Sequence, residues 1–442
     1  MPAPDRGGAR DPHPCALLLL AAAVCAVCGC ASVPRGSRPA AAAAPPQTQP
    51  SPTAIDYVFR IDEALSTLDG RACFHGPAPD DLVSGVHFGG DYMRHAEVTT
   101  SKGPRELPVV DHRIDLSGVS DDACVSYTVD LGAVASRFGG FDVSRHGDAL
   151  VTNVALWLWR PTRWEAVGKL TARFELPAGM QASLPWPHQG DLYELDHSAL
   201  AFYAFAVFGR FELEEVKAPG ATLDVAILPG LPPSTRANVV PWLEQASRAA
   251  ALSSGQFPRQ GAQIVVIPTP PAKEAVRFGT TNRGGGASMA LLLPVNAQLE
   301  PLLHDWVAVH EFCHLLHPFI ERDDAWLSEG LATYYQEVLR VRAGMEAEQD
   351  AWRRLYEGSL LGRGAAHLSE LSADMFANMS FKMVYWAGAS FALMADVELR
   401  RRSHGQMTLD QVMGELAKSL PADPRPLRAR EVVERLDRIV GA

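Results

Sequence analysis

The chain has 442 residues, of which 47% are hydrophobic and 21% are charged, and this composition excludes disorder or collagen-like structure for most of its length. Its 51 acidic and 40 basic residues give a formal net charge of -11 with no basic block, so no nucleic-acid partner is expected. The length is enough for two or three domains with a sizeable core.

The first 30 residues have the pattern of an export signal. The apolar run at 15–28 is too short to span a bilayer comfortably, and it ends in Val-Cys-Gly-Cys. This ending resembles the bacterial lipoprotein signal, which implies lipidation of Cys30 and a place in the cell envelope at the outer membrane. An ordinary secretory leader is the alternative. Residues 31–53, rich in Ala, Pro, Ser and Gln, are predicted to be a linker.

Three cysteines lie outside the leader. Cys73 and Cys124 fall in the N-terminal half of an exported chain, where they either form a disulfide or stay as two buried thiols. Cys313 has no second cysteine nearby and is interpreted as a small buried apolar residue.

Residues 54–218 are predicted to form a β-rich N-terminal domain. Short β-branched and aromatic runs at 57–61, 149–159, 168–176 and 199–207 are separated by turn residues. This pattern indicates an antiparallel β-sandwich-like domain with a supporting or recognition role.

Residues 219–442 are predicted to form a second domain of mixed character. Apolar runs at 222–228 and 263–267 have the pattern of strands and flank a helical stretch at 234–252. The chain after Pro301 is mostly helical in pattern, so the whole molecule is predicted to be an α+β multidomain protein.

The strongest chemical signal is the segment His310-Glu311-Phe312-Cys313-His314. It lies in an apolar stretch at 302–320 that predicts a largely buried helix, on which His310 and His314 lie one above the other on one face. Two such imidazoles can bind one tetrahedral metal ion, and the neighbouring Glu311 can accept a proton from metal-bound water. The alternative is a pair of core histidines with a solvated glutamate.

Glu329 is the predicted third ligand. It begins an amphipathic helix, and the intervening stretch at 317–324 contains Pro318 and paired acids that can turn the chain. Two antiparallel helices joined in this way bring Glu329 back to the two histidines. His304 and His317 are rival ligands that we interpret as structural.

With these residues in place, the sequence resembles the gluzincin zinc peptidases. The motif HEFCH is followed after fourteen residues by Glu329 within WLSEGLATYY, a pattern most similar to the glycyl aminopeptidase family and more distantly to aminopeptidase N. The resemblance implies a thermolysin-like, mostly helical catalytic domain with one Zn²⁺ per chain on His310, His314 and Glu329.

Two further segments carry the resemblance. The stretch at 283–293 is similar to the Gly-rich edge strand on which these enzymes lay the substrate backbone, which implies a substrate-binding role for Gly284, Gly285 and Gly286. An ordinary Gly-rich loop is the alternative. The stretch at 383–402 is similar to the family's helix that begins with a tyrosine. By that match Tyr385 donates a hydrogen bond to the developing oxyanion.

Three features depart from the family. The spacing between His314 and Glu329 is shorter than usual, and the stretch at 287–289 lacks the glutamate that commonly holds the substrate's α-ammonium group. The PDZ-type domain often found at the family's C-terminus has no room after Met413. The resemblance therefore implies a zinc peptidase acting on a peptide or protein, aminopeptidase-like, with an endopeptidase or a catalytically silent envelope-assembly lipoprotein as alternatives.

Overall fold

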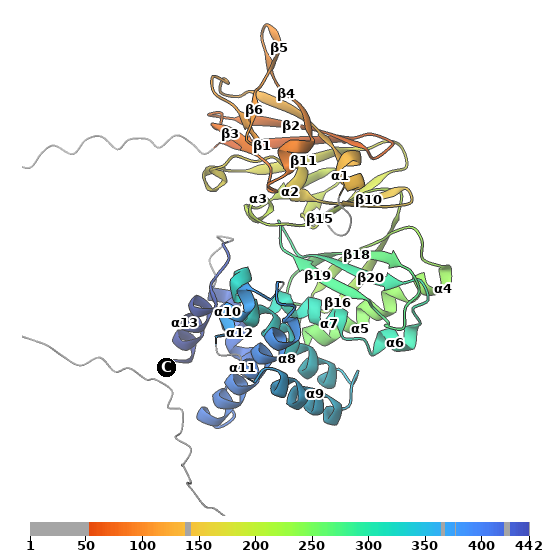
Figure 1. The fold of residues 1–442 in the computed structure, drawn as a ribbon, viewed down its shortest axis with the longest axis vertical. Coiled ribbons are helices and arrows are strands. Elements are labelled where there is room, and N and C mark those ends of the chain that lie inside the picture. The colour runs from red at the N-terminus through yellow and green to blue at the C-terminus, as the bar shows by residue number, and fades with distance from the viewer. Residues whose placement is uncertain (1–52, 138–142, 364–366, 376, 420–424, 442) are drawn as a thin grey trace, which may run out of the picture. The chain divides into compact units, whose positions relative to one another are not determined.

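The structure, a computed structural model, describes residues 53–137, 143–363, 367–375, 377–419 and 425–441. The predicted leader, Cys30 and all of the predicted linker except Thr53 lie outside these residues. Residues 51–442 form a single compact unit. The fold class is confirmed, because a β-rich N-terminal half precedes a mostly helical C-terminal half (Figure 1).

The N-terminal half is built on an eight-stranded sheet with the order β13-β14-β11-β1-β2-β8-β4-β5. Its strands are β1 (Ala54–Ile61), β2 (Thr67–His75), β4 (Met93–Thr100), β5 (Gly103–Glu106), β8 (Cys124–Asp130), β11 (Leu170–Glu175), β13 (His188–Gln189) and β14 (Leu192–Leu195). Alternate residues of β1 are buried, as the period of two along a half-buried strand requires. They pack in a core that contains Trp157 and Trp186.

Two smaller sheets complete this half, with the orders β12-β15-β10-β9 and β3-β7-β6. Their strands are β3 (Asp81–Val83), β6 (Val109–Val110), β7 (Arg113–Asp115), β9 (Val143–His146), β10 (Ala149–Asn153), β12 (Gln181–Ser183) and β15 (Phe205–Gly209). Three short helices lie among them, α1 (Leu131–Arg137), α2 (Val154–Trp157) and α3 (Ser198–Ala201).

The prediction for this half needs three corrections. β1 pairs in parallel with β11, so the large sheet is mixed rather than antiparallel. The predicted strand at 149–159 ends at Asn153, whose side chain accepts from the Ala155 N–H and caps α2. The predicted strand at 199–207 begins as α3 and becomes β15 only at Phe205. Short apolar runs do not distinguish a buried strand from a buried helical turn.

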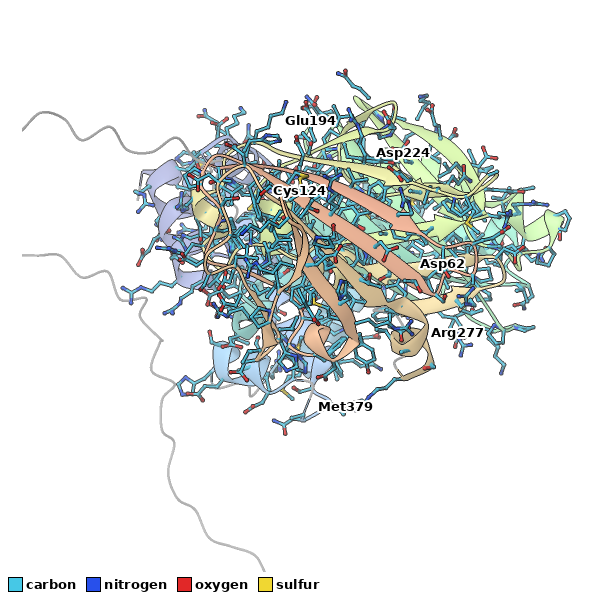
Figure 2. The ribbon with its side chains drawn as sticks, turned by 90° about the horizontal axis from the view of Figure 1, so that it is seen from above. Asp62, Cys124, Glu194, Asp224, Arg277 and Met379 are labelled. Atoms are coloured by element: carbon cyan, nitrogen blue, oxygen red, sulfur yellow. A yellow bond between two sulfur atoms is a disulfide. The ribbon has the colours of Figure 1, made fainter. Side chains whose placement is uncertain are left out.

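Cys73 and Cys124 are joined by a disulfide. They are register partners on the neighbouring strands β2 and β8, with a Cα–Cα distance of 4.0 Å. Figure 2 labels Cys124 on this sheet. The disulfide therefore staples two central strands of the large sheet.

The C-terminal half begins with a five-stranded sheet, in the order β16-β17-β18-β20-β19. Its strands are β16 (Glu212–Ala218), β17 (Ala221–Ile227), β18 (Gly261–Thr269), β19 (Phe278–Asn282) and β20 (Ser288–Pro294). β17, β18 and β20 run parallel, and the edge strands β16 and β19 are antiparallel to their neighbours. The predicted domain boundary at Ala218 falls at the end of β16, which already belongs to this sheet.

Helices make up most of the remainder (Figure 1). Those with α-helical hydrogen bonding are α4 (Pro233–Arg236), α5 (Val239–Ala251), α6 (Leu299–Leu303), α7 (Val307–Cys313), α8 (Ala325–Arg342), α9 (Glu348–Leu361), α10 (Leu368–Ala373), α11 (Phe381–Arg402), α12 (Leu409–Ser419) and α13 (Ala429–Val440). The predicted helix at 302–320 is therefore much shorter than expected, because the chain leaves α-helical geometry after Cys313.

The two halves meet through a small apolar cluster between sheets. Val151 and Val207 of the four-stranded sheet pack with Ala226, Val265 and Ala290 of the five-stranded sheet. Buried polar contacts add to it: the Gln263 amide donates to the Ser183 carbonyl at 2.8 Å, and the Trp186 indole donates to the Gly284 carbonyl at 2.9 Å. Across the described ranges, no helix combines the length and apolarity needed to cross a bilayer.

Candidate metal centre

The HEFCH segment forms α7 and the turn after it. His310 and Glu311 lie in the last turns of α7, and His314 begins a 3₁₀ turn (His314–Leu316). Cys313 and His314 keep helical backbone angles, so the relation between positions i and i+4 is preserved. The two imidazole centroids are 4.9 Å apart. One helical face thus presents both histidines.

Glu329 converges on this face from α8, as the sequence predicts. Its Oε2 lies 3.3 Å from His310 Nε2 and 3.6 Å from His314 Nε2. Among the described residues, these three form a group whose donor atoms all lie within 4.8 Å of one another. The predicted ligand set is therefore assembled in the fold.

The chain returns to the histidines through a short connection. It extends at His317 and tightens into a 3₁₀ turn (Arg322–Asp324), and α8 begins at Ala325. Asp324 anchors this connection, because its carboxylate accepts from the Ser369 hydroxyl at 2.7 Å and from the Ala429 N–H at 2.8 Å. Glu329 is the fifth residue of α8 rather than its first.

The donor set and its surroundings fit a zinc ion. Ligand atoms about 2.0–2.1 Å from a tetrahedral zinc are separated by about 3.3–3.4 Å, close to the two distances from Glu329 Oε2. His310 Nδ1 donates to the Gln336 side-chain oxygen at 2.7 Å, which leaves the Nε2 lone pair for a metal. His314 Nδ1 lies 3.3 Å from the Ser328 hydroxyl.

Glu311 lies beside the candidate ligands and is almost fully buried. Burial raises the pKa of its carboxyl to about 7, although His310 and a hydrogen bond from Thr281 act in the opposite direction. That hydrogen bond, from Thr281 Oγ1 to Glu311 Oε2, is 2.7 Å long. β19 approaches closely here, since a Cβ atom added at Gly279 would lie 2.6 Å from Glu311 Cγ.

Tyr385, in the first turns of α11, also lies at the group. Its ring stacks on the His310 imidazole with centroids 6.0 Å apart, and its side chain is hydrogen-bonded to Glu329. Burial, together with the charge of Glu329, raises the pKa of this phenol well above its ordinary value, so the hydroxyl stays protonated as a donor. The sequence-predicted Tyr385 is therefore placed where it can donate a hydrogen bond beside the ligands.

The three glycines predicted to bind substrate lie in a turn that packs against the N-terminal half of the chain. Gly284, Gly285 and Gly286 form the turn between β19 and β20, and an added Cβ at Gly285 would meet the Trp186 ring at 2.5 Å. They allow close packing of the two halves of the chain. The edge of the sheet is β19 rather than the predicted stretch at 283–293, most of which becomes the inner strand β20.

His304 and His317 stand outside the ligand group. His317 Nδ1 donates to the Pro318 carbonyl and His304 Nδ1 to the Met345 carbonyl, each at 2.7 Å. Cys313 is buried and free, as expected.

Four residues at the site were missed in the sequence. Gln336 contacts His310, and Thr281 contacts Glu311. Ser328 contacts His314. Arg283 donates to the His314 carbonyl and, at 2.9 Å, to the His317 carbonyl. Gln336 follows Glu329 by two helical turns, and this spacing was the one local signal that pointed to it.

Solved structures of low sequence identity share this fold. An aminopeptidase N family protein from Idiomarina loihiensis has a TM-score of 0.63 at 18% identity, over 82% of this chain and 70% of that one. An M1 zinc metallopeptidase from Deinococcus radiodurans has a TM-score of 0.53 at 14% identity, over 89% and 92%. The fold is that of the M1 zinc metallopeptidases.

Yeast LTA4 hydrolase is a further structural relative, with a TM-score of 0.53 at 10% identity over 88% of this chain and 66% of that one. A mutant of the Deinococcus enzyme bound to a Tyr-Ser-Ala substrate matches with a TM-score of 0.51 over 90% of this chain. No protein-family model matches the sequence, and neither does any curated protein.

Proposed function

We propose that the protein is a zinc-dependent peptidase with one metal ion per chain, held by His310, His314 and Glu329. The observation that carries the proposal is the convergence of these three donors beside the buried Glu311, in a fold of the M1 metallopeptidase type. A zinc ion held there supplies a Lewis acid that polarises a carbonyl group and lowers the pKa of water.

The chain's own residues supply the proton transfers. Glu311 takes the proton of the attacking water and delivers it to the leaving amine. The hydrogen bond from Thr281 orients the Glu311 carboxylate, and the close passage of β19 at Gly279 keeps water away from one side of it. Tyr385 donates its hydroxyl hydrogen to the oxyanion that develops on the scissile carbonyl.

A peptide fits this site because a strand edge passes it. β19 pairs with β20 on one side only within the described sheet, so its other edge can pair with an extended backbone. β19 also contacts α7, the helix that carries His310 and Glu311, which supports a peptide position near the proposed metal site. The Deinococcus relative bound to Tyr-Ser-Ala supports a peptide as the class of substrate.

The amine end of the substrate distinguishes two forms of the activity. We propose aminopeptidase-like action, with an endopeptidase as the second candidate. The second is favoured by one observation: β19, whose sequence is FGTTN, carries no carboxylate for an α-ammonium group. Free and N-acetylated forms of one peptide separate them, because acetylation abolishes turnover only if the amine is recognised.

Glu311→Gln tests the proposal against a silent binding protein. We expect zinc to be retained at one equivalent per chain in wild type and variant, since Glu311 is not a ligand. Peptide turnover should fall by at least ~10²-fold, because the proton acceptor is lost. Equal activity of wild type and variant would refute the mechanism, and His314→Ala is the matched control that should lose the metal.

We also propose that the protein is an exported lipoprotein of the bacterial envelope, anchored through Cys30. The disulfide between Cys73 and Cys124 supports an oxidising compartment. Cys30→Ala should move the protein from the membrane fraction to the soluble fraction. If the variant stays with the membrane, the lipid anchor is wrong.

A further inference from the structure

A chain of polar side chains runs from the candidate metal ligand His310 into α9. Beyond Gln336 it continues through Glu337, whose Oε1 accepts from the Gln336 amide nitrogen at 2.9 Å. Glu337 Oε2 accepts two hydrogen bonds from Arg354, at 2.9 Å from Nε and 2.7 Å from the terminal nitrogen. We name Gln336, Glu337 and Arg354 the α8–α9 network.

The chemistry of the side chains determines which groups donate and which accept hydrogen bonds along the network. An ionised carboxylate only accepts hydrogen bonds, so Glu337 must face the Gln336 NH₂ group rather than its oxygen. The Gln336 oxygen then faces His310 and accepts from Nδ1–H. Nδ1 of His310 therefore keeps its proton, and Nε2 is the ring nitrogen that faces Glu329 and is left to bind a metal.

Arg354 stabilises Glu337 as the acceptor of the hydrogen bond from the Gln336 amide. Glu337 is only 1% exposed, and a buried carboxylate is unfavourable unless it is paired and hydrogen-bonded. Arg354 donates both of its hydrogen bonds to one carboxylate oxygen, Glu337 Oε2, and it also forms an ion pair with Glu346. Glu346 in turn pairs with Arg340 at 2.7 Å, so two acidic and two basic groups balance in charge.

The second histidine lacks such an arrangement. Among the residues that the structure describes, His314 Nδ1 is hydrogen-bonded to the Ser328 hydroxyl at 3.3 Å, and a hydroxyl can donate or accept. The orientation of the His310 ring and the proton on its Nδ1 are consequently set by the Gln336 side chain before any metal arrives.

We propose that Glu337 and Arg354 are positioning residues for metal binding, which act on His310 through the Gln336 amide. The inference rests on the metal site of the proposed function. Neither residue is among the proposed ligands, and Arg354 contacts Glu337 from a different helix, α9. Partners of a ligating histidine commonly contribute about 10–100-fold to metal affinity, and we expect an effect of this size.

The test is the dissociation constant of zinc alone, measured on the full chain by competition with a chelator. Glu337→Gln keeps the size of the side chain but allows the Gln336 amide to turn over, and zinc binding should weaken about 10–100-fold. Gln336→Leu should weaken it to a similar extent. In the Gln336→Leu background, Glu337→Gln should add less than about twofold, because the path to His310 is already cut.

Two further variants control for folding. Arg354→Lys keeps the positive charge but replaces the two guanidinium donors to Glu337 Oε2 by one ammonium group, so zinc binding should weaken by an intermediate factor even if Glu337→Gln fails to fold. Arg353→Gln removes an exposed ion pair with Asp350 on the same helix and should change zinc affinity less than about twofold.

The outcomes separate this inference from the proposed function. If wild type binds zinc and the network variants bind it equally well, the inference is overturned while the peptidase proposal stands. The inference is also overturned if Gln336→Leu and Glu337→Gln weaken zinc binding independently, so that their effects multiply in the double variant. Glu337 would then not act through Gln336. If wild type binds no zinc at all, both proposals fail.

Discussion

Two glycines set the distance between the helices that carry Glu329 and Tyr385. α8 and α11 cross at Gly330 and Gly388, where a Cβ atom added at Gly388 would overlap the Trp326 carbonyl oxygen and lie 2.8 Å from Gly330 Cα. Ordinary contact begins at 3.4 Å, so Gly388→Ala must push the helices apart. Both helices carry site residues, and the site should open with them.

This geometry sets the expected loss of unfolding free energy in Gly388→Ala. Overpacking of a tight contact costs about 1–3 kcal/mol, and the crowding atoms are backbone, which places this contact at the upper end. Alanine regains about 1 kcal/mol of helix propensity, which leaves a net loss of about 2 kcal/mol. At an unfolding entropy of about 2.1 cal/mol/K per residue, the unit at 51–442 loses roughly 1 °C of Tm per kcal/mol, so Tm should fall by about 2–3 °C.

The effect on activity should be larger than the effect on stability. Displacement of a catalytic group by about 1 Å can cost around 10²-fold in rate. We therefore expect kcat/KM for a peptide to fall by about that factor in Gly388→Ala. The assay is steady-state turnover beside thermal unfolding, both on the zinc-loaded protein.

Gly414→Ala is the matched control. Gly414 lies within α12, and an added Cβ would meet no atom within 4 Å, so this variant should gain up to about 1 kcal/mol and keep full activity. A Gly388→Ala protein as stable and as active as wild type would refute the reasoning, because the helices would then have room that the structure denies them.

Three other predictions follow from single contacts. Replacing Cys73 and Cys124 by alanine should cost about 4 kcal/mol in the chain-entropy model for a separation of 51 residues, and unchanged thermal unfolding would contradict this. Thr281→Val removes a hydrogen bond that lowers the pKa of Glu311, so the acidic limb of the kcat/KM profile should move up by about one pH unit; a downward shift would contradict the assignment. Burial raises the pKa of Asp305 from 3.8 to about 6, so the folded state binds the proton more tightly than the unfolded state does. The contribution of this group to the unfolding free energy is therefore lost as the pH rises from 3.8 through 6. Asp305→Asn should therefore raise the unfolding free energy by about 1–2 kcal/mol at pH 7 and by little at pH 4, and an equal gain at both would show that charge is not the cause.

The sequence alone determined the chemistry of the candidate site, because that chemistry is local. His310 and His314 share a helical face through their spacing, which the fold preserves although α7 ends at Cys313. Glu329 returns because a short connection between two helices leaves few other paths, and the sequence predicted this convergence from turn residues and periodicity.

The tertiary structure decided everything that depends on pairing between distant segments. Strand order made β19 the edge of the sheet and moved Gly284 into a turn, and no periodicity encodes which strand lies outermost. The same holds for Cys73 facing Cys124, Thr281 reaching Glu311, and Arg354 supporting Glu337. Each of these contacts joins residues whose separation in sequence carries no pattern, so only the packed fold brings them together.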